Sequence, residues 1–101
     1  MAWVYILECS DGSYYVGSTI DLETRVSKHQ QGLGAAYTRH RLPVALRWAA
    51  EFARIDDAYA FEKRVQGWSR RKREALMRGD LAALRGLASR SWTSLRDRTE
   101  D

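Results

Sequence analysis

The stretch VYILECSDGSYYVGST, residues 4–19, decides the fold that the sequence predicts. Two runs rich in valine, isoleucine and tyrosine flank an Asp-Gly pair, a pattern typical of two antiparallel strands joined by a tight turn. We expect these strands over residues 3–9 and 14–19. Each strand carries a tyrosine, Tyr5 or Tyr15, and at this point the rings suit either a core or a functional site.

The rest of the chain predicts helices around one further strand. We expect a helix over residues 21–32, a loop over 33–43, a third strand over 44–52, and helices over 57–68, 70–78 and 81–88, with N-caps at Asp21, Asp56, Ser69 and Asp80. The order β-β-α-β-α with extra C-terminal helices is that of an α+β domain, in which helices flank a small three-stranded antiparallel sheet. We expect the domain over residues 1–79 and a helical extension with a flexible tail over residues 80–101.

Composition indicates one small intracellular domain. The chain has 101 residues, of which 45% are hydrophobic, which is enough for one modest core. Cys9 is the single cysteine, so an internal disulfide and a cysteine-only zinc site are excluded. A reducing, cytoplasmic environment follows most simply. We expect neither a signal peptide nor a membrane span, because no basic leader or long apolar stretch is present.

Positive charge is concentrated in the middle of the chain. The net charge is +4, and residues 25–79 carry thirteen Lys or Arg against five acidic residues. Residues 1–24 carry four acidic residues and no Lys or Arg. Such a concentration favours a polyanion as partner, with nucleic acid as the first candidate. A solvated basic surface explains the charge equally well, so charge alone leaves both open.

Three polar side chains fall on or near the apolar stripes of their helices. At about 100° per residue, His29 and Arg25 lie on the side of Leu22, and Glu62 lies beside Ala58. Burial of such groups without partners is costly, so each needs a partner or a solvent-filled cleft. For any one residue, an Arg25–Glu62 ion pair or a satisfied core histidine is the simpler explanation. Three such residues and two tyrosines on one small sheet favour a site.

These residue types suit phosphodiester hydrolysis. A guanidinium binds a phosphate through two hydrogen bonds, and one glutamate can hold Mg²⁺ when a substrate phosphate and waters complete the coordination. A tyrosine hydroxyl can position or deprotonate a water if nearby cations lower its pKa from about 10. No phosphate-binding loop, serine nucleophile motif or zinc-ligand spacing supports a rival chemistry.

The motifs and their spacing resemble the GIY-YIG nuclease superfamily. VYI at residues 4–6 and YVG at residues 15–17 match the two halves of the family signature. They are followed by three further matching patterns: T-x-D-L-x-x-R-x-x-x-H, G-A-x-Y-T-R-x-R-x-P and F-E. Over residues 2–78 the run is similar to the small, single-domain YhbQ-like branch. Trp3 and Val4 replace the glycine and isoleucine of the first half, which keeps only its tyrosine.

The resemblance implies a role for each matching residue. Tyr5 would act as base or water-orienting group, and Tyr15 would shape the same site. Arg25 would stabilise charge on the scissile phosphate, and His29 would assist proton transfer. Glu62 would bind the divalent metal ion, Mg²⁺ or Mn²⁺.

A second group of residues is expected to contact the nucleic acid. Gly17 matches the closing glycine of the signature, where a side chain would crowd the substrate backbone. In residues 37–41 an aromatic side chain stands among arginines, which suits contacts with bases and phosphates. The basic run 70–73 stands at a helix start, where the helix dipole is unfavourable to cations and a bound phosphate would compensate for it. Either segment could instead simply be solvated. The expected substrate-binding residues are Gly17, Tyr37, Arg39, Arg41 and Arg71. Gln66, one turn after Glu62, stands in for a family asparagine.

The shared site makes a prediction about the hairpin. A two-residue Asp-Gly turn would place Tyr15 opposite Glu8, and the two tyrosines would point to opposite faces of the sheet. We instead predict a three-residue loop or a bulge around residues 11–14, which places Tyr15 opposite Cys9 and on the face of Tyr5.

We therefore expect a metal-dependent endonuclease that hydrolyses phosphodiester bonds in DNA, in repair or processing. One alternative is a nucleic-acid-binding domain with the same fold and little cleavage. Another is a structural partner-binding protein, which would need no cleft. Metal-dependent cleavage that disappears in Glu62→Ala separates the first from the second, and the absence of salt-dependent affinity for nucleic acid would favour the third.

Overall fold

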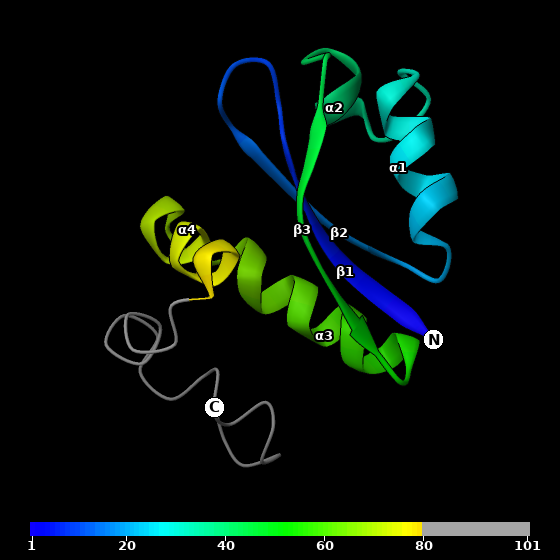
Figure 1. Ribbon diagram of the computed structural model, residues 1–101, viewed down its shortest axis with the longest axis vertical. Helices are drawn as coiled ribbons and strands as arrows, with labels where there is room; N and C mark the ends of the chain where they lie inside the picture. The colour runs from blue at the N-terminus through cyan, green and yellow to red at the C-terminus, as the bar shows by residue number, and fades with distance from the viewer. Residues whose placement is uncertain (80–101) are drawn as a thin grey trace. The chain divides into compact units, whose positions relative to one another are not determined.

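The computed structural model of the protein describes residues 1–79. In chain order the elements, coloured from blue to yellow in Figure 1, are β1 (Ala2–Glu8), β2 (Tyr14–Thr19), α1 (Leu22–Gln30), α2 (Ala36–Arg39), β3 (Ala45–Phe52), α3 (Ile55–Gln66) and α4 (Arg70–Arg78). The first compact unit ends at Gln66, and α4 belongs to the second. The expected helix over 81–88 and the tail lie outside the described residues. No helix within residues 1–79 is long and apolar enough to cross a membrane.

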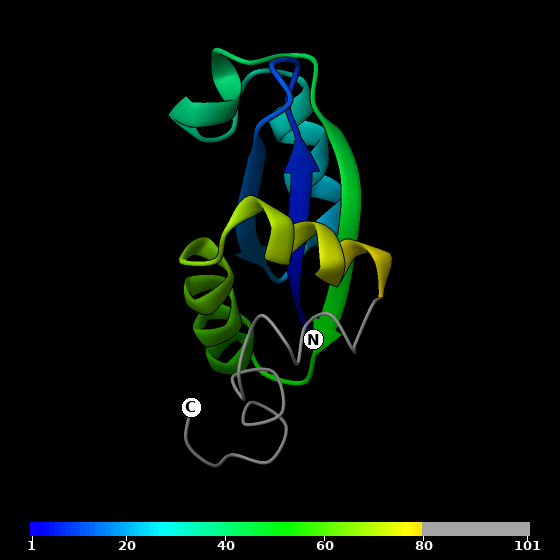
Figure 2. The ribbon, with the colours of Figure 1, turned by 90° about the vertical axis from the view of Figure 1, so that its left-hand side faces the viewer.

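A three-stranded antiparallel sheet of order β2-β1-β3 forms the centre of the first unit, which confirms the predicted α+β class. Helix α1 covers one face of this sheet, where Val26 packs with Tyr5, Leu7 and Val44. Helix α3 covers the opposite face (Figure 2), where the ring of Phe61 packs against two aromatic rings of β3. The two helices therefore present their side chains to the sheet from opposite sides.

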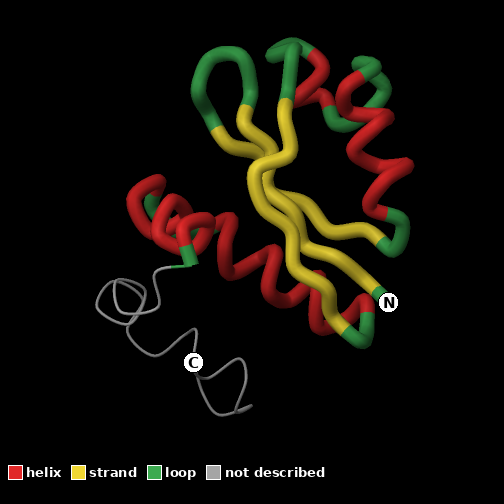
Figure 3. The backbone as a smooth tube through the Cα atoms, viewed as in Figure 1, coloured by secondary structure: helices red, strands yellow, loops and turns green. Residues whose placement is uncertain are grey.

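The β1–β2 hairpin has a three-residue loop, shown in green between the two yellow strands in Figure 3. The backbone N–H of Cys9 donates to the Ser13 carbonyl over 2.8 Å, and Gly12 takes a φ of +85° at the end of the loop. Tyr5 and Tyr15 share one face, as predicted. The predicted pairing of Tyr15 was wrong by two residues: Tyr15 opposes Leu7 and not Cys9, because the loop begins one residue earlier than expected.

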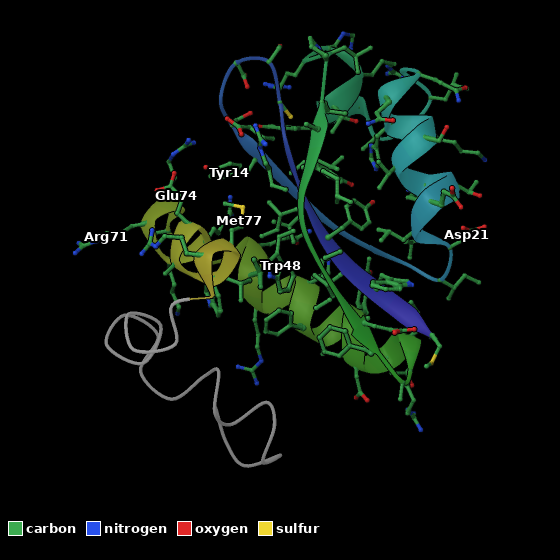
Figure 4. All side chains as sticks on the ribbon, in the orientation of Figure 1. Tyr14, Asp21, Trp48, Arg71, Glu74 and Met77 are labelled. Atoms are coloured by element: carbon green, nitrogen blue, oxygen red, sulfur yellow. The ribbon has the colours of Figure 1, made fainter. Side chains whose placement is uncertain are left out.

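Local capping chemistry set two of the helix starts as predicted. The Asp21 side chain accepts a hydrogen bond from the backbone N–H of Thr24 and begins α1 (Figure 4). Ser69 accepts one from Lys72 at the start of α4, and Gly79 ends that helix with a φ of +73°.

Other boundaries differ from the prediction. Helix α3 begins at Ile55, so Asp56 lies in the first turn, where its charge suits the helix dipole, and does not cap the helix. Helix α2 lies inside the expected loop, because a single turn is too short to show a helical period.

Candidate active site

The buried centre of the candidate site joins β1, α1 and α2. The Tyr5 hydroxyl lies 3.0 Å from Nε2 of His29, and Nδ1 of His29 lies 2.8 Å from the Thr38 hydroxyl oxygen. The Thr38 hydroxyl donates to the carbonyl of Ala35 over 3.1 Å. The side chains of Tyr5, His29 and Thr38 are all at most 1% exposed. Because these three side chains have almost no exposed surface, their polar atoms depend mainly on protein partners.

Two glycines make room for this centre. A Cβ at Gly17 would lie 2.5 Å from the Tyr5 hydroxyl oxygen and 3.2 Å from the ring of Tyr15. A Cβ at Gly34 would lie 2.8 Å from Cγ and Cε1 of His29. Gly17 was expected to leave room for the substrate backbone, but the nearer reason in the structure is the phenol of Tyr5.

Sequence reasoning assigned no role to Gly34 or Thr38. Both stand in the segment GAAYTR, residues 34–39, which the family pattern includes. A glycine followed four residues later by a threonine carries no chemical signature of its own. Only the fold shows that both residues touch His29.

An aromatic cluster extends from the centre toward α2. The ring of Tyr15 lies 5.1 Å from the ring of His29 and 6.1 Å from that of Tyr37, measured between centroids. The Arg41 guanidinium lies 3.9 Å over the Tyr37 ring, donates to the Tyr37 carbonyl, and pairs with Asp11 of the hairpin loop over 3.1 Å. Arg41 therefore ties the hairpin loop to α2.

The remaining predicted substrate contacts differ in setting. Arg39 is exposed and forms no ion pair within the described part of the chain. Arg71 is exposed on α4, in the second compact unit, and its role stays a prediction.

Arg25 lies on α1, one turn before His29, and is half-buried. Its positive charge lies close enough to the Tyr5 hydroxyl to oppose the rise that burial causes in the pKa of Tyr5. Across residues 1–79 Arg25 makes no ion pair, so the alternative of a structural pair with Glu62 is not realised. Its positive charge is therefore not neutralised by a protein carboxylate there.

Glu62 reaches the site from the opposite face of the sheet. Its carboxylate, on α3, accepts hydrogen bonds from the Ser18 hydroxyl over 2.5 Å and from the Gln66 amide over 2.6 Å. Ser18 follows Gly17 in the edge strand β2, and the charge of Glu62 acts on Tyr5 across that strand. The sequence grouped Glu62 with Tyr5, Tyr15, Arg25 and His29 in one site, but Glu62 comes from α3, which covers the face of the sheet opposite to α1.

Glu62 is the residue that fits a divalent metal. No cluster of three or more His, Cys, Asp or Glu side chains suited to a metal occurs within residues 1–79. The Ser18 and Gln66 donors hold the two carboxylate oxygens and leave each with a further lone pair. One oriented carboxylate suits Mg²⁺, which keeps several waters and takes substrate phosphate oxygens as ligands.

Burial keeps both central groups neutral near pH 7. It raises the pKa of Tyr5 to about 12, and the interaction with the Arg25 guanidinium opposes this rise only in part. Burial, with a smaller contribution from the charge of Arg25, lowers the pKa of His29 to about 4. The condition that nearby cations lower the pKa of the tyrosine from about 10 is therefore not met for Tyr5.

Comparisons with known proteins agree with this fold. The GIY-YIG catalytic domain matches residues 1–75. The chain is 47% identical over 76 residues to a UPF0213 protein of Halobacterium salinarum, and the aligned residues cover 75% of this chain and 99% of that protein. It is 43% identical over 76 residues to a UPF0213 protein of Streptococcus pneumoniae, and the aligned residues cover 75% of this chain and 77% of that protein. The solution NMR structure of a UPF0213 protein from Bacillus halodurans matches with 44% identity and a TM-score of 0.52, covering 79% and 86%.

Proposed function

This chain belongs to the GIY-YIG family, and from that premise we propose that it is a metal-dependent endonuclease that hydrolyses phosphodiester bonds in DNA. One observation carries the proposal: the Tyr5 hydroxyl lies 3.0 Å from Nε2 of His29 and is influenced by the positive charge of Arg25. A hydroxyl, a proton acceptor and a fixed positive charge thus meet at one point. Glu62 adds a carboxylate across the edge strand.

In the proposed reaction, Tyr5 and His29 handle the proton of the attacking water. The Tyr5 hydroxyl orients the water, and as the water attacks phosphorus its proton passes to the phenol oxygen while the phenolic proton passes to Nε2 of His29. The P–O bond to the leaving oxygen of the DNA breaks as the new P–O bond forms, and the leaving oxygen takes a proton from solvent water. This coupled transfer avoids a free phenolate, which the pKa of about 12 disfavours. His29 can accept the proton because burial keeps its imidazole neutral.

Two further groups would stabilise the negative charge that develops on the phosphate. Arg25 stays charged at any biological pH and can donate to a non-bridging phosphate oxygen. Glu62 would hold Mg²⁺ or Mn²⁺, and the bound metal would act as a Lewis acid on the phosphate. Ser18 and Gln66 orient the carboxylate, as outer partners of metal ligands commonly do.

The basic middle of the chain supports a nucleic-acid substrate. We assign phosphate or base contacts to Tyr37, Arg39, Arg41 and Arg71, with Gly17 serving Tyr5 more directly than the substrate. A small cytoplasmic enzyme of this kind suits DNA repair or processing.

The test is a cleavage assay on labelled single-stranded, duplex and forked DNA, with Mg²⁺, Mn²⁺ or a chelator. We expect metal-dependent cleavage that falls by about 10²-fold or more in Glu62→Gln, with binding changed little. Glu51→Gln, which alters an exposed carboxylate on β3, is the matched control and should cleave like the parent protein. Salt-dependent binding without cleavage of any substrate would replace the proposal with the binding-domain alternative.

A further inference from the structure

We propose that Thr38 is a positioning residue for this reaction: its hydroxyl fixes His29 in the tautomer that carries hydrogen on Nδ1, and so keeps Nε2 free to receive the proton of Tyr5. The inference rests on the proposed nuclease function for its catalytic consequence. Its structural part, the tautomer of His29, stands on the contacts alone.

The argument begins with the hydrogens of three buried side chains. Tyr5 and Thr38 each have one hydroxyl hydrogen, and neutral His29 has one ring hydrogen. The contacts form a single chain: Tyr5 hydroxyl to Nε2, Nδ1 to Thr38 hydroxyl, and Thr38 hydroxyl to the Ala35 carbonyl. Because a carbonyl only accepts, the Thr38 hydrogen can point to Ala35, which leaves the Thr38 oxygen to accept from Nδ1–H.

Only one direction along this chain satisfies every hydrogen. With hydrogen on Nδ1, the phenolic hydrogen of Tyr5 points to the bare Nε2, and all three hydrogens have acceptors. In the opposite direction Thr38 donates to Nδ1 and Nε2–H donates to the Tyr5 oxygen. The Tyr5 hydrogen then has no acceptor among the hydrogen bonds found within residues 1–79. A buried unsatisfied hydroxyl is strongly disfavoured, so the first direction prevails.

The surroundings of His29 offer no substitute for Thr38. The charged and titratable groups that face the imidazole are Tyr5 from β1, Tyr15 from β2 and Arg25 from its own helix. Arg25 has no acceptor atom, and the Tyr5 hydroxyl is already on the Nε2 side. Gly34 lies against the ring and would collide with it if it carried a Cβ, so the ring has little room to turn.

A neutral hydroxyl suits this task better than a carboxylate would. A carboxylate at Nδ1 would favour the charged imidazolium and occupy Nε2 with a proton before the reaction begins. Threonine orients the ring through a hydrogen bond without adding charge. His29 therefore stays neutral and receptive until the water attacks.

Long-range ¹H–¹⁵N correlation spectra of the imidazoles at pH 7 test the structural part. We expect Nδ1–H and a bare Nε2 for His29 in the parent protein and in Thr38→Ser, and loss of that pattern in Thr38→Val. Thr24→Val, at an exposed threonine of α1, is the matched control and should leave the spectrum unchanged. A parent His29 with hydrogen on Nε2 would overturn the proposal even if Thr38→Val fails to fold.

Single-turnover cleavage with saturating enzyme tests the catalytic part. We expect the rate to fall by about 10- to 100-fold in Thr38→Val, with DNA affinity unchanged and the rate largely restored in Thr38→Ser. A Thr38→Val protein that keeps the Nδ1–H tautomer, or that cleaves at the parent rate, would overturn the proposal. If the parent protein cleaves no DNA, the nuclease function fails, and the spectra still decide whether Thr38 fixes His29.

Discussion

Tyr5 and Gly17 are direct partners across the β1–β2 ladder, and the Tyr5 hydroxyl occupies the space where a side chain at position 17 would begin. The same hydroxyl lies 3.0 Å from Nε2 of His29 on α1. The glycine of the second motif thus serves the tyrosine of the first, and the two halves of the signature form one structural unit.

The first prediction concerns Gly17→Ala. Its Cβ would lie 2.5 Å from the Tyr5 oxygen, so the phenol must leave the position in which it contacts His29. A displacement of about 1 Å can cost about 10²-fold in rate, and we expect a loss of that size in single-turnover cleavage. Gly12→Ala is the control, because its Cβ meets nothing within 4 Å and only the positive φ is strained. Parent-like cleavage by Gly17→Ala would contradict the role assigned to Tyr5.

The second prediction is that His29 makes stability depend on pH on the acid side. The pKa of His29 is about 4 in the folded protein and about 6.5 when unfolded. Between these values the unfolded chain binds the proton and the folded chain does not, so stability falls as pH falls from about 6.5 to about 4. At about 1.4 kcal/mol per pKa unit, the loss approaches about 3 kcal/mol.

Urea denaturation between pH 4 and pH 7 measures this dependence. The His29→Gln variant should lack that part of the pH dependence, whereas His40→Gln, at an exposed histidine after α2, should keep it. The raised pKa of Tyr5 affects stability at alkaline pH. The contribution of Tyr5 to folding stability is complete below about pH 10 and is lost as pH rises through about 12. An acid limb that persists in His29→Gln would contradict the assignment.

A third prediction concerns the residues that orient Glu62. Ser18→Ala and Gln66→Ala each remove one donor to the carboxylate but leave the carboxylate itself. We expect the Mg²⁺ concentration for half-maximal cleavage to rise by about 10- to 100-fold, with the rate recovered at high Mg²⁺. Glu62→Gln should not recover at any Mg²⁺ concentration. Metal titrations that coincide for the parent and both donor variants would show that the two hydrogen bonds do not serve the metal.

The fourth prediction distinguishes the effects of Arg39, which lies in α2, and Arg41, which follows α2, on DNA binding and on stability. Arg39→Ala should weaken DNA binding, lower the slope of log affinity against log salt by about 1, and leave stability unchanged. Arg41→Ala should also lower the free energy of unfolding by about 1 kcal/mol, because it loses the contact with the Tyr37 ring and carbonyl. Arg54→Ala, an exposed arginine beside α3, is the control for both assays. Equal stability of the Arg39 and Arg41 variants would contradict the bridging role of Arg41.

The sequence by itself determined the parts of this protein that depend on local chemistry. Alternation and the Asp-Gly pair predicted the hairpin, and the capping side chains of Asp21 and Ser69 predicted two helix starts, because these signals act over a few residues. The helical period placed His29 on the interior side of α1, where the structure buries it.

Only the tertiary structure decided which groups meet and what state they are in. The sequence placed Glu62 on the inner side of its helix, but the face of the sheet that α3 covers depends on packing among distant strands. Likewise, a role for Thr38 and Gly34 becomes evident only in the folded chain, where both residues lie against His29. The pKa values of Tyr5 and His29 depend on burial at that meeting point, since desolvation outweighs the nearby charge of Arg25 and no stretch of sequence encodes it locally.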